Sequence, residues 1–215
     1  MNYKNKRLPC SFSLLKKSNV SILIRKTYKD LLIMQGIENT SRLTRKDKSA
    51  EYFQGRHLTP SVLIKGTENE RMVIRHYMRG GLARLISRDV FWEKLRPLNE
   101  LIVSEYALGR GVPTSEILAV LQHKLFGWWY RADMVSKQIP GGIDLITYFE
   151  NIEKKTGKKP GKKKIKEKRE LISLVAGAIN KMHQADIYHV DLHLKNILIQ
   201  NQNSFRNKTY IIDFY

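Results

Sequence analysis

Cysteine, acidic residues and long apolar runs are all scarce in this sequence. The single cysteine, Cys10, cannot form an intramolecular disulfide, which excludes a disulfide-stabilised scaffold and fits a reducing compartment. No apolar run approaches the roughly 20 residues of a membrane-spanning helix. Lys16 and Lys17 interrupt the short stretch near the N-terminus where a signal-peptide core would lie. These absences predict a cytoplasmic protein.

The charge balance is strongly basic, because 39 Lys and Arg residues stand against 20 Asp and Glu, a formal net charge of +19. Such a charge predicts a polyanionic partner: nucleic acid, an anionic membrane surface or a phosphorylated substrate. An apolar content of 42% rules out a wholly disordered chain. The 215 residues are enough for one medium domain or for two small lobes sharing a cleft.

The middle of the chain is predicted to pass from β to α structure. Apolar, β-branched runs at 61–65 and 72–77 flank a polar turn, which is typical of a hairpin. Helix punctuation and helical spacing of apolar residues predict the later elements. These are a helix from Pro97 to Gly109, a strand and turn over 128–142, a short helix over 143–149 and a helix over 169–184.

The stretch Asn151–Glu170 carries nine lysines and Arg169. Gly157, Pro160 and Gly161 forbid one continuous helix through it, so it is predicted to be a mobile basic loop. One interpretation is a solvated insertion, and another is a surface that docks on anionic phospholipid, where each Lys or Arg contributes about 1 kcal/mol. Nucleic acid binding is disfavoured because the block lacks the interleaved aromatic residues of a stacking platform.

A segment near the C-terminus has the spacing of a phosphoryl-transfer site. Tyr188–Ile199 has the form H-x-D-L-x-x-x-N followed by an apolar run, and a second run, Tyr210–Tyr215, contains Asp-Phe. This order is typical of protein-kinase-like folds. Asp191 is then the carboxylate beside the attacking hydroxyl, and Asn196 and Asp213 are the Mg²⁺ ligands, since hard oxygen donors suit Mg²⁺.

Two neighbours of these residues receive separate interpretations. His189 is predicted to pack beneath the loop rather than to perform acid–base chemistry. Lys195 directly precedes Asn196, where its cation would offset the charge of a transferring phosphate. A solvent-facing lysine is the alternative for that position.

The upstream half should supply a nucleotide clamp. Kinase-like folds place a cation on the third strand, paired with a Glu on the following helix. Here the cation is Arg75 in place of the usual Lys, with Glu100 as its expected partner and Glu105 as the competitor. The phosphate-covering loop should contain Gly55, and Met134–Ile139 is the expected hinge that presents backbone groups to adenine.

Four segments, taken in order, resemble the bacterial lipopolysaccharide kinase family. The most specific pieces are R-H-Y-x-R-G-G at 75–81 and Y-R-A-D at 130–133, and the resemblance runs from about Gln54 to the C-terminus. It implies ATP- and Mg²⁺-dependent phosphorylation of the 4-hydroxyl of 3-deoxy-D-manno-octulosonic acid (Kdo) on a lipid A precursor. It also implies peripheral attachment to the anionic cytoplasmic face of the inner membrane, with no nucleic acid partner. Asp191 matches the family's active-site aspartate.

The expected fold class is α+β: a bilobal protein-kinase-like fold with a β-rich N-lobe and a shortened helical C-lobe. Residues 1–50 are a basic N-terminal segment of unassigned role, and 51–139 form the N-lobe and hinge. Residues 140–215 form the C-lobe, with a Lys-rich insertion at 153–169, a catalytic loop at 188–196 and an apparent truncation after Asp-Phe. The alternatives are a kinase-like phosphotransferase acting on another small-molecule or protein hydroxyl, and an inactive, truncated pseudokinase.

Overall fold

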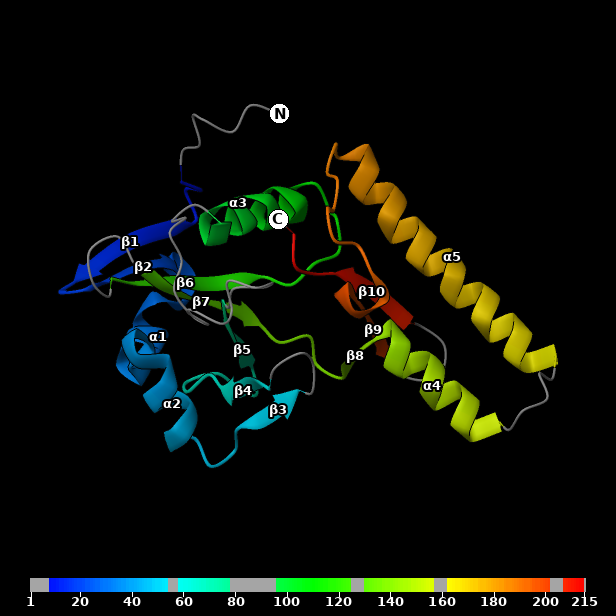
Figure 1. The fold of residues 1–215 in the computed structure, drawn as a ribbon, viewed down its shortest axis with the longest axis horizontal. Coiled ribbons are helices and arrows are strands. Elements are labelled where there is room, and N and C mark those ends of the chain that lie inside the picture. The colour runs from blue at the N-terminus through cyan, green and yellow to red at the C-terminus, as the bar shows by residue number, and fades with distance from the viewer. Residues whose placement is uncertain are drawn as a thin grey trace, which may run out of the picture. The chain divides into compact units, whose positions relative to one another are not determined.

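The computed structural model describes residues 8–53, 58–77, 96–124, 130–156, 162–201 and 207–214. The chain divides into two compact units (Figure 1). Unit 1 comprises Met1–Ile102 and Glu116–Gln138, and unit 2 comprises Val103–Ser115 and Ile139–Tyr215. Both units combine strands with helices, so the prediction of a mixed α and β fold is confirmed.

Unit 1 is built on a seven-stranded antiparallel sheet with the strand order β1-β2-β6-β7-β5-β4-β3. The predicted hairpin is present, with Ser61 opposite Val73. Its strands are displaced by no more than two residues from the predicted ranges. The seven strands are β1 (Phe12–Lys17), β2 (Val20–Arg25), β3 (Glu51–Phe53), β4 (Thr59–Leu63), β5 (Arg71–His76), β6 (Ile117–Lys124) and β7 (Tyr130–Lys137).

The basic N-terminal region belongs to this sheet and does not form a segment apart. Strand β2 pairs with both β1 and β6, although β6 lies about a hundred residues further along the chain. Two short helices follow, α1 (Lys29–Gln35) and α2 (Thr40–Lys46), with 3-10 turns at Lys26–Tyr28 and Ile37–Asn39. The expected division near residue 50 therefore does not coincide with a boundary between the units.

Each face of the unit 1 sheet has its own apolar cluster. One cluster joins the strands to α1 and α2 through residues such as Leu32, Leu43 and Ile74. The other includes Leu101 of α3 (Arg96–Gly109), the helix predicted from its Pro and Gly punctuation. Because side chains alternate along a strand, consecutive residues of β5 and β7 point to opposite faces. Figure 1 shows α1 and α2 on one side of this sheet and α3 on the other.

Unit 2 contains a three-stranded antiparallel sheet in the order β10-β9-β8. The strands are β8 (Gly142–Asp144), β9 (Ile197–Asn201) and β10 (Asn207–Ile211), and a 3-10 turn, η5 (Leu194–Asn196), precedes β9. The helices are α4 (Leu145–Thr156) and α5 (Lys162–Gln184). Leu145 of α4, Leu171 of α5 and Ile199 of β9 form one buried cluster, which holds in place the strand that follows residues 188–196.

The lysine-rich stretch is only partly a loop. Helix α4 continues to Thr156 and α5 begins at Lys162, seven residues before the predicted start at Arg169. The residues between these helices lie outside the described part of the chain. Lysine has a good helix propensity, so the break needs only the short Gly- and Pro-containing link. Along α5 the predicted apolar stripe is largely buried, but Leu174, at its margin, is half-exposed.

Most of the expected hinge, Met134–Ile139, belongs to strand β7 in the structure. Strand β7 continues to Lys137, and Ser136 pairs with Val73 of β5 on one side and with Ile117 of β6 on the other. Backbone groups of an inner strand are used by the sheet ladder, so most of this segment has none to offer to adenine. Among the residues that the structure describes, no helix is long and apolar enough to cross a membrane.

Candidate active site

Unit 1 contains an ion pair between the half-buried Arg75 on β5 and the buried Glu100 on α3. Glu100 is only 2% exposed, and its second carboxylate oxygen accepts a hydrogen bond from the Tyr77 hydroxyl. The Arg75 guanidinium carbon lies 5.2 Å from the centre of the Tyr77 ring, and Nη2 lies 3.5 Å from the Met134 sulfur. The predicted pairing is confirmed, with Glu100 as the partner. The competitor, Glu105, comes five residues after Glu100 on α3 and so lies about 140° further round the helix than Glu100.

Removing the Arg75 side chain should therefore affect stability and nucleotide use together. Arg75→Ala removes the cation that pairs with the buried Glu100 carboxylate, which should lower the free energy of unfolding by on the order of 2 kcal/mol. Arg75→Lys keeps a cation but loses the planar guanidinium. We expect weaker binding of a fluorescent ATP analogue for Arg75→Ala than for Arg75→Lys, measured with thermal unfolding of both. Equal losses would show that a cation alone does not suffice at this position and that the planar guanidinium is required.

Two sequence predictions for unit 1 fall on residues that are not described. The candidate phosphate-covering loop with Gly55 lies between β3 and β4, as expected for a loop joining two strands before Arg75, but residues 54–57 are outside the described ranges. The Arg-Gly-Gly end of the first family motif is outside them as well.

In unit 2, His189 packs against the loop of residues 188–196, the predicted catalytic loop and here called the catalytic-motif loop. Its Nε2 lies 2.8 Å from the carbonyl oxygen of Ile212, and its Nδ1 accepts a hydrogen bond from the backbone N–H of Asp191 at 3.2 Å. Its ring also packs 5.3 Å from that of Phe214, which is buried. With Nδ1 accepting, Nε2 is the ring nitrogen that donates to the Ile212 carbonyl. The structural role predicted for His189 is confirmed.

Asp191 and Asn196 are held together by a hydrogen bond across the loop. The Asn196 side-chain Nδ2 donates to the Asp191 backbone carbonyl at 3.0 Å, and Asn196 itself is 8% exposed. This hydrogen bond uses the backbone of Asp191, and the Asp191 side chain is 45% exposed to solvent. His193 Nε2 lies 3.7 Å from an Asp191 carboxylate oxygen. Sequence reasoning missed His193, although its position two residues after Asp191 was a signal.

Asp213 is tied to Asn196 through the backbone. The Ile212 N–H donates to the Asn196 carbonyl at 2.9 Å, and the next residue, Asp213, has φ of +68°. A left-handed backbone is uncommon outside glycine, and Asp is among the residues that tolerate it best. Such conformations concentrate at functional sites, where surrounding contacts enforce them. The enforcing contacts here come from His189, Asn196 and the buried Phe214.

The donor set of this loop suits Mg²⁺. Asn196 uses its amide nitrogen within the protein, so its side-chain oxygen is the atom that can face a cation, and Asp213 offers a carboxylate. Both are hard oxygen donors. Within the described ranges, no group of three or more His, Cys, Asp and Glu side chains could hold a metal ion. A Mg²⁺ ion held by Asn196 and Asp213 would take its other ligands from phosphate oxygens and water, as Mg²⁺ commonly does.

Lys195 is exposed, and its backbone N–H donates to His193 Nδ1 at 3.2 Å. This bond belongs to the 3-10 turn η5 that leads into β9. The side chain is placed next to Asn196 in sequence and is open to solvent, which leaves both interpretations of Lys195 standing as predictions.

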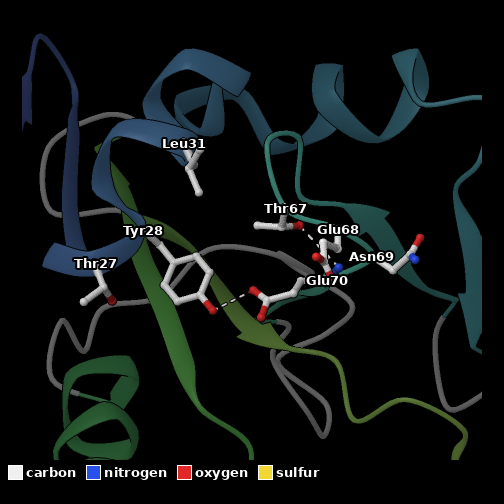
Figure 2. A pocket seen from close by; sticks show the side chains of 7 residues that line it. All are labelled: Thr27, Tyr28, Leu31, Thr67, Glu68, Asn69 and Glu70. Atoms are coloured by element: carbon white, nitrogen blue, oxygen red, sulfur yellow. Dashed lines mark hydrogen bonds between the residues drawn. The ribbon is translucent and has the colours of Figure 1, made fainter.

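A second polar cluster in unit 1 was not predicted. The Tyr28 hydroxyl donates to Glu70 at 2.7 Å and accepts from Lys137 Nζ at 2.9 Å, and Lys137 also pairs with Glu70. The hydrogen bonds from Lys137 and Tyr28 lower the pKa of Glu70, while burial raises that of Tyr28. Figure 2 shows Tyr28 and Glu70 meeting beside a hollow lined also by Thr27, Leu31 and Thr67–Asn69. These three polar groups satisfy one another and join the α1 region to the end of β7.

Comparison with known proteins adds the following findings. The model of the lipopolysaccharide kinase (Kdo/WaaP) family matches residues 40–215. The 3-deoxy-D-manno-octulosonic acid kinase of Vibrio cholerae serotype O1 is 31% identical over 164 residues, which are 74% of this chain and 61% of that protein. The enzyme of the same name from Vibrio parahaemolyticus is 30% identical over 176 residues, 77% of this chain and 66% of that protein. The chain thus spans less than two thirds of the length of these relatives.

Among solved structures, WaaP in complex with acyl carrier protein is similar, with a TM-score of 0.54 over 90% of this chain and 70% of that one. The sequence identity is 12%, so this likeness shows a shared fold.

Proposed function

The chain belongs to the lipopolysaccharide kinase (Kdo/WaaP) family, and from that premise we propose that it is a bilobal, protein-kinase-like phosphotransferase. Its substrates in this proposal are ATP and the 4-hydroxyl of Kdo on a lipid A precursor. The observation that carries the proposal is the interlocked loop of unit 2, in which backbone and side-chain hydrogen bonds connect the segments of Asp191, Asn196 and Asp213. The names of the relatives support Kdo as the acceptor.

In the proposed reaction, Asp191 accepts the proton of the acceptor hydroxyl as its oxygen attacks the γ-phosphorus. A new O–P bond forms, the bond between the γ-phosphorus and the β,γ-bridging oxygen breaks, and ADP leaves with that electron pair. Asn196 and Asp213 would hold Mg²⁺, which when bound neutralises charge on the phosphates. Arg75, fixed by Glu100, would contact the nucleotide phosphates, and Lys195 would offset charge on the transferred group.

The acceptor class is tested by following the label from γ-³²P-ATP. The full chain is incubated with Mg²⁺ and, separately, Kdo-lipid A, soluble Kdo and a protein substrate. Transfer to Kdo-lipid A is the expected result. Transfer only to a soluble sugar or to protein would support the alternative kinase-like phosphotransferase, and nucleotide binding without transfer would support a pseudokinase.

The proposal includes docking of the basic end of α5 on the anionic cytoplasmic face of the inner membrane. Lys166 and Arg169 are exposed. Ile165 and Ile172, seven residues apart and so on one stripe of the helix, are 41% and 59% exposed. Cations beside exposed apolar residues are typical of a helix that lies in a membrane interface. Lys168 is different, because it pairs with Glu153 of α4 at 3.4 Å and lies 5.7 Å from the centre of the Phe149 ring.

Neutralising this block should release the protein from anionic vesicles. Each lysine contributes about 1 kcal/mol at such a surface, so five Lys→Gln changes should weaken binding to phosphatidylglycerol vesicles by at least about 100-fold. Lys168 stays unchanged because it supports the helix pair. Vesicle co-sedimentation at rising salt measures the effect, since exposed charges are screened over about 8 Å at physiological ionic strength. The five positions are Lys158, Lys162, Lys163, Lys164 and Lys166.

A control variant removes the same charge from unit 1. The five lysines chosen for this control are exposed, so their replacement with Gln should leave the fold unchanged. If both variants lose vesicle binding equally, net charge alone is responsible and the block is no docking site. The control positions are Lys16, Lys26, Lys46, Lys48 and Lys65.

A further inference from the structure

A fully buried carboxylate, Asp133, lies on the strand next to Arg75, and no step of the proposed reaction uses it. Asp133 is 0% exposed. One carboxylate oxygen accepts a hydrogen bond from the Thr40 hydroxyl at 2.6 Å, and the other lies 2.6 Å from His76 Nδ1. His123 Nε2, buried on β6, lies 3.9 Å from the first oxygen. Burial raises the pKa of Asp133, but the bonds from His76 and Thr40 outweigh it, so its pKa lies below the ordinary value.

The register of β5 and β7 connects this cluster to the clamp. His76 is directly opposite Asp133, and Arg75 is directly opposite Met134. The first pair faces the α2 side of the sheet, through Thr40, and the second faces the α3 side, where Arg75 meets Glu100. A one-residue slip between strands would exchange the two faces. The contact that fixes His76 against Asp133 therefore also decides on which face Arg75 lies.

In this pair the Asp133 carboxylate is fully buried, whereas the His76 side chain is 36% exposed. A buried ionised group is a poor source of stability, because an apolar group of similar volume usually stabilises a fold as well or better. The best-attested use of such a pair is to specify one register. The three-residue run Arg75-His76-Tyr77 is consistent with that use: its first and third side chains contact Glu100, and its middle one contacts Asp133.

We infer that Asp133 is the positioning residue of the clamp: through His76 and Thr40 it holds β5 in the register that presents Arg75 to Glu100. The effect on nucleotide binding rests on the proposed function, whereas the effect on the Arg75–Glu100 pair does not. Asp133 has no contact with substrate in this inference and acts only through Arg75.

The first experiment is a double-mutant cycle on the affinity for trinitrophenyl-ATP with Mg²⁺. Asp133→Asn should weaken binding about tenfold in the wild-type chain and less than twofold in an Arg75→Ala background, because the side chain through which it acts is then gone. A general structural defect would give the same loss in both backgrounds, and that additivity would overturn the inference. His76→Leu should behave like Asp133→Asn. His76→Asn, whose amide can donate near the position of Nδ1, should restore most of the affinity.

The second experiment needs no nucleotide. In chains labelled with ¹⁵N-arginine, the ion pair with Glu100 should slow rotation of the Arg75 guanidinium, whose signals are assigned by their loss in Arg75→Lys. Asp133→Asn and His76→Leu should abolish this slow rotation. Glu70→Gln, which breaks the half-buried cluster of Tyr28, Glu70 and Lys137 in the same unit, should preserve it.

Unchanged Arg75 signals in both Asp133→Asn and His76→Leu would overturn the inference. If the wild-type chain binds no trinitrophenyl-ATP, the proposed function fails, and the arginine signals still decide the positioning role. His76 is more exposed than Asp133, so its variants keep the test available if Asp133→Asn does not fold.

Discussion

Replacing Asp191 with asparagine should lower turnover by about 10²–10⁴-fold, the usual contribution of a positioned general base. An alcohol is a poor nucleophile near neutral pH, and the amide of asparagine cannot accept its proton. The substitution keeps the shape of the side chain, and the hydrogen bonds that residue 191 makes with His189 and Asn196 are through its backbone N–H and C=O. The loop should therefore keep its structure, and Mg·ATP binding should stay nearly unchanged.

The matched control is Asp186→Asn, the same chemical change at an exposed position five residues earlier. Asp186 has a positive φ of 56°, which asparagine tolerates as well as aspartate does. Label transfer from γ-³²P-ATP to Kdo-lipid A measures turnover, and calorimetric titration measures nucleotide affinity. Near-normal turnover in Asp191→Asn, or an equal loss in Asp186→Asn, would remove Asp191 from the role of base.

Sequence reasoning located the loop at 188–196 because its contacts join residues that are close in the sequence. Asn196 reaches the carbonyl of Asp191 five residues away, and β10, which begins six residues after the end of β9, pairs with it. The Arg75–Glu100 pair was predictable for a related reason: the strand and the helix that carry the two residues each had a clear period and clear ends. Their roles in phosphoryl transfer remain predictions.

Long-range pairing was what the sequence could not reveal. Strand β2 pairs with β6, whose residues lie about a hundred positions further along the chain. The local sequence pattern of β2 does not indicate which strand it pairs with. Asp133 is the last residue of the Y-R-A-D motif, but its contacts with Thr40 and His76 depend on tertiary structure. The start of α5 was missed for a different reason, because a dense run of lysines has no apolar period even where it is helical.

Replacing Asp213 with asparagine should weaken Mg·ATP binding by about 10–100-fold, unlike the same change at Asp191. Asp213 offers the only negative charge of the proposed pair of metal ligands, because Asn196 is neutral. Asparagine keeps an oxygen donor but removes the attraction between that charge and Mg²⁺, which is strong at ligand distance. Asparagine also tolerates the left-handed backbone of this position, so the loss should reflect charge and not a changed turn.

Calorimetric titration of ATP at several Mg²⁺ concentrations separates the two aspartates. For Asp213→Asn the affinity should recover partly as Mg²⁺ is raised, because the defect is in holding the ion. Asp191→Asn should show nearly wild-type affinity at every Mg²⁺ concentration, with its defect confined to turnover. The two changes are chemically identical and lie in loops joined by the Ile212–Asn196 hydrogen bond, so a general weakening of the loop would affect both alike. Equal losses of nucleotide affinity in the two variants would therefore show that the assignment of base to Asp191 and metal ligand to Asp213 is wrong.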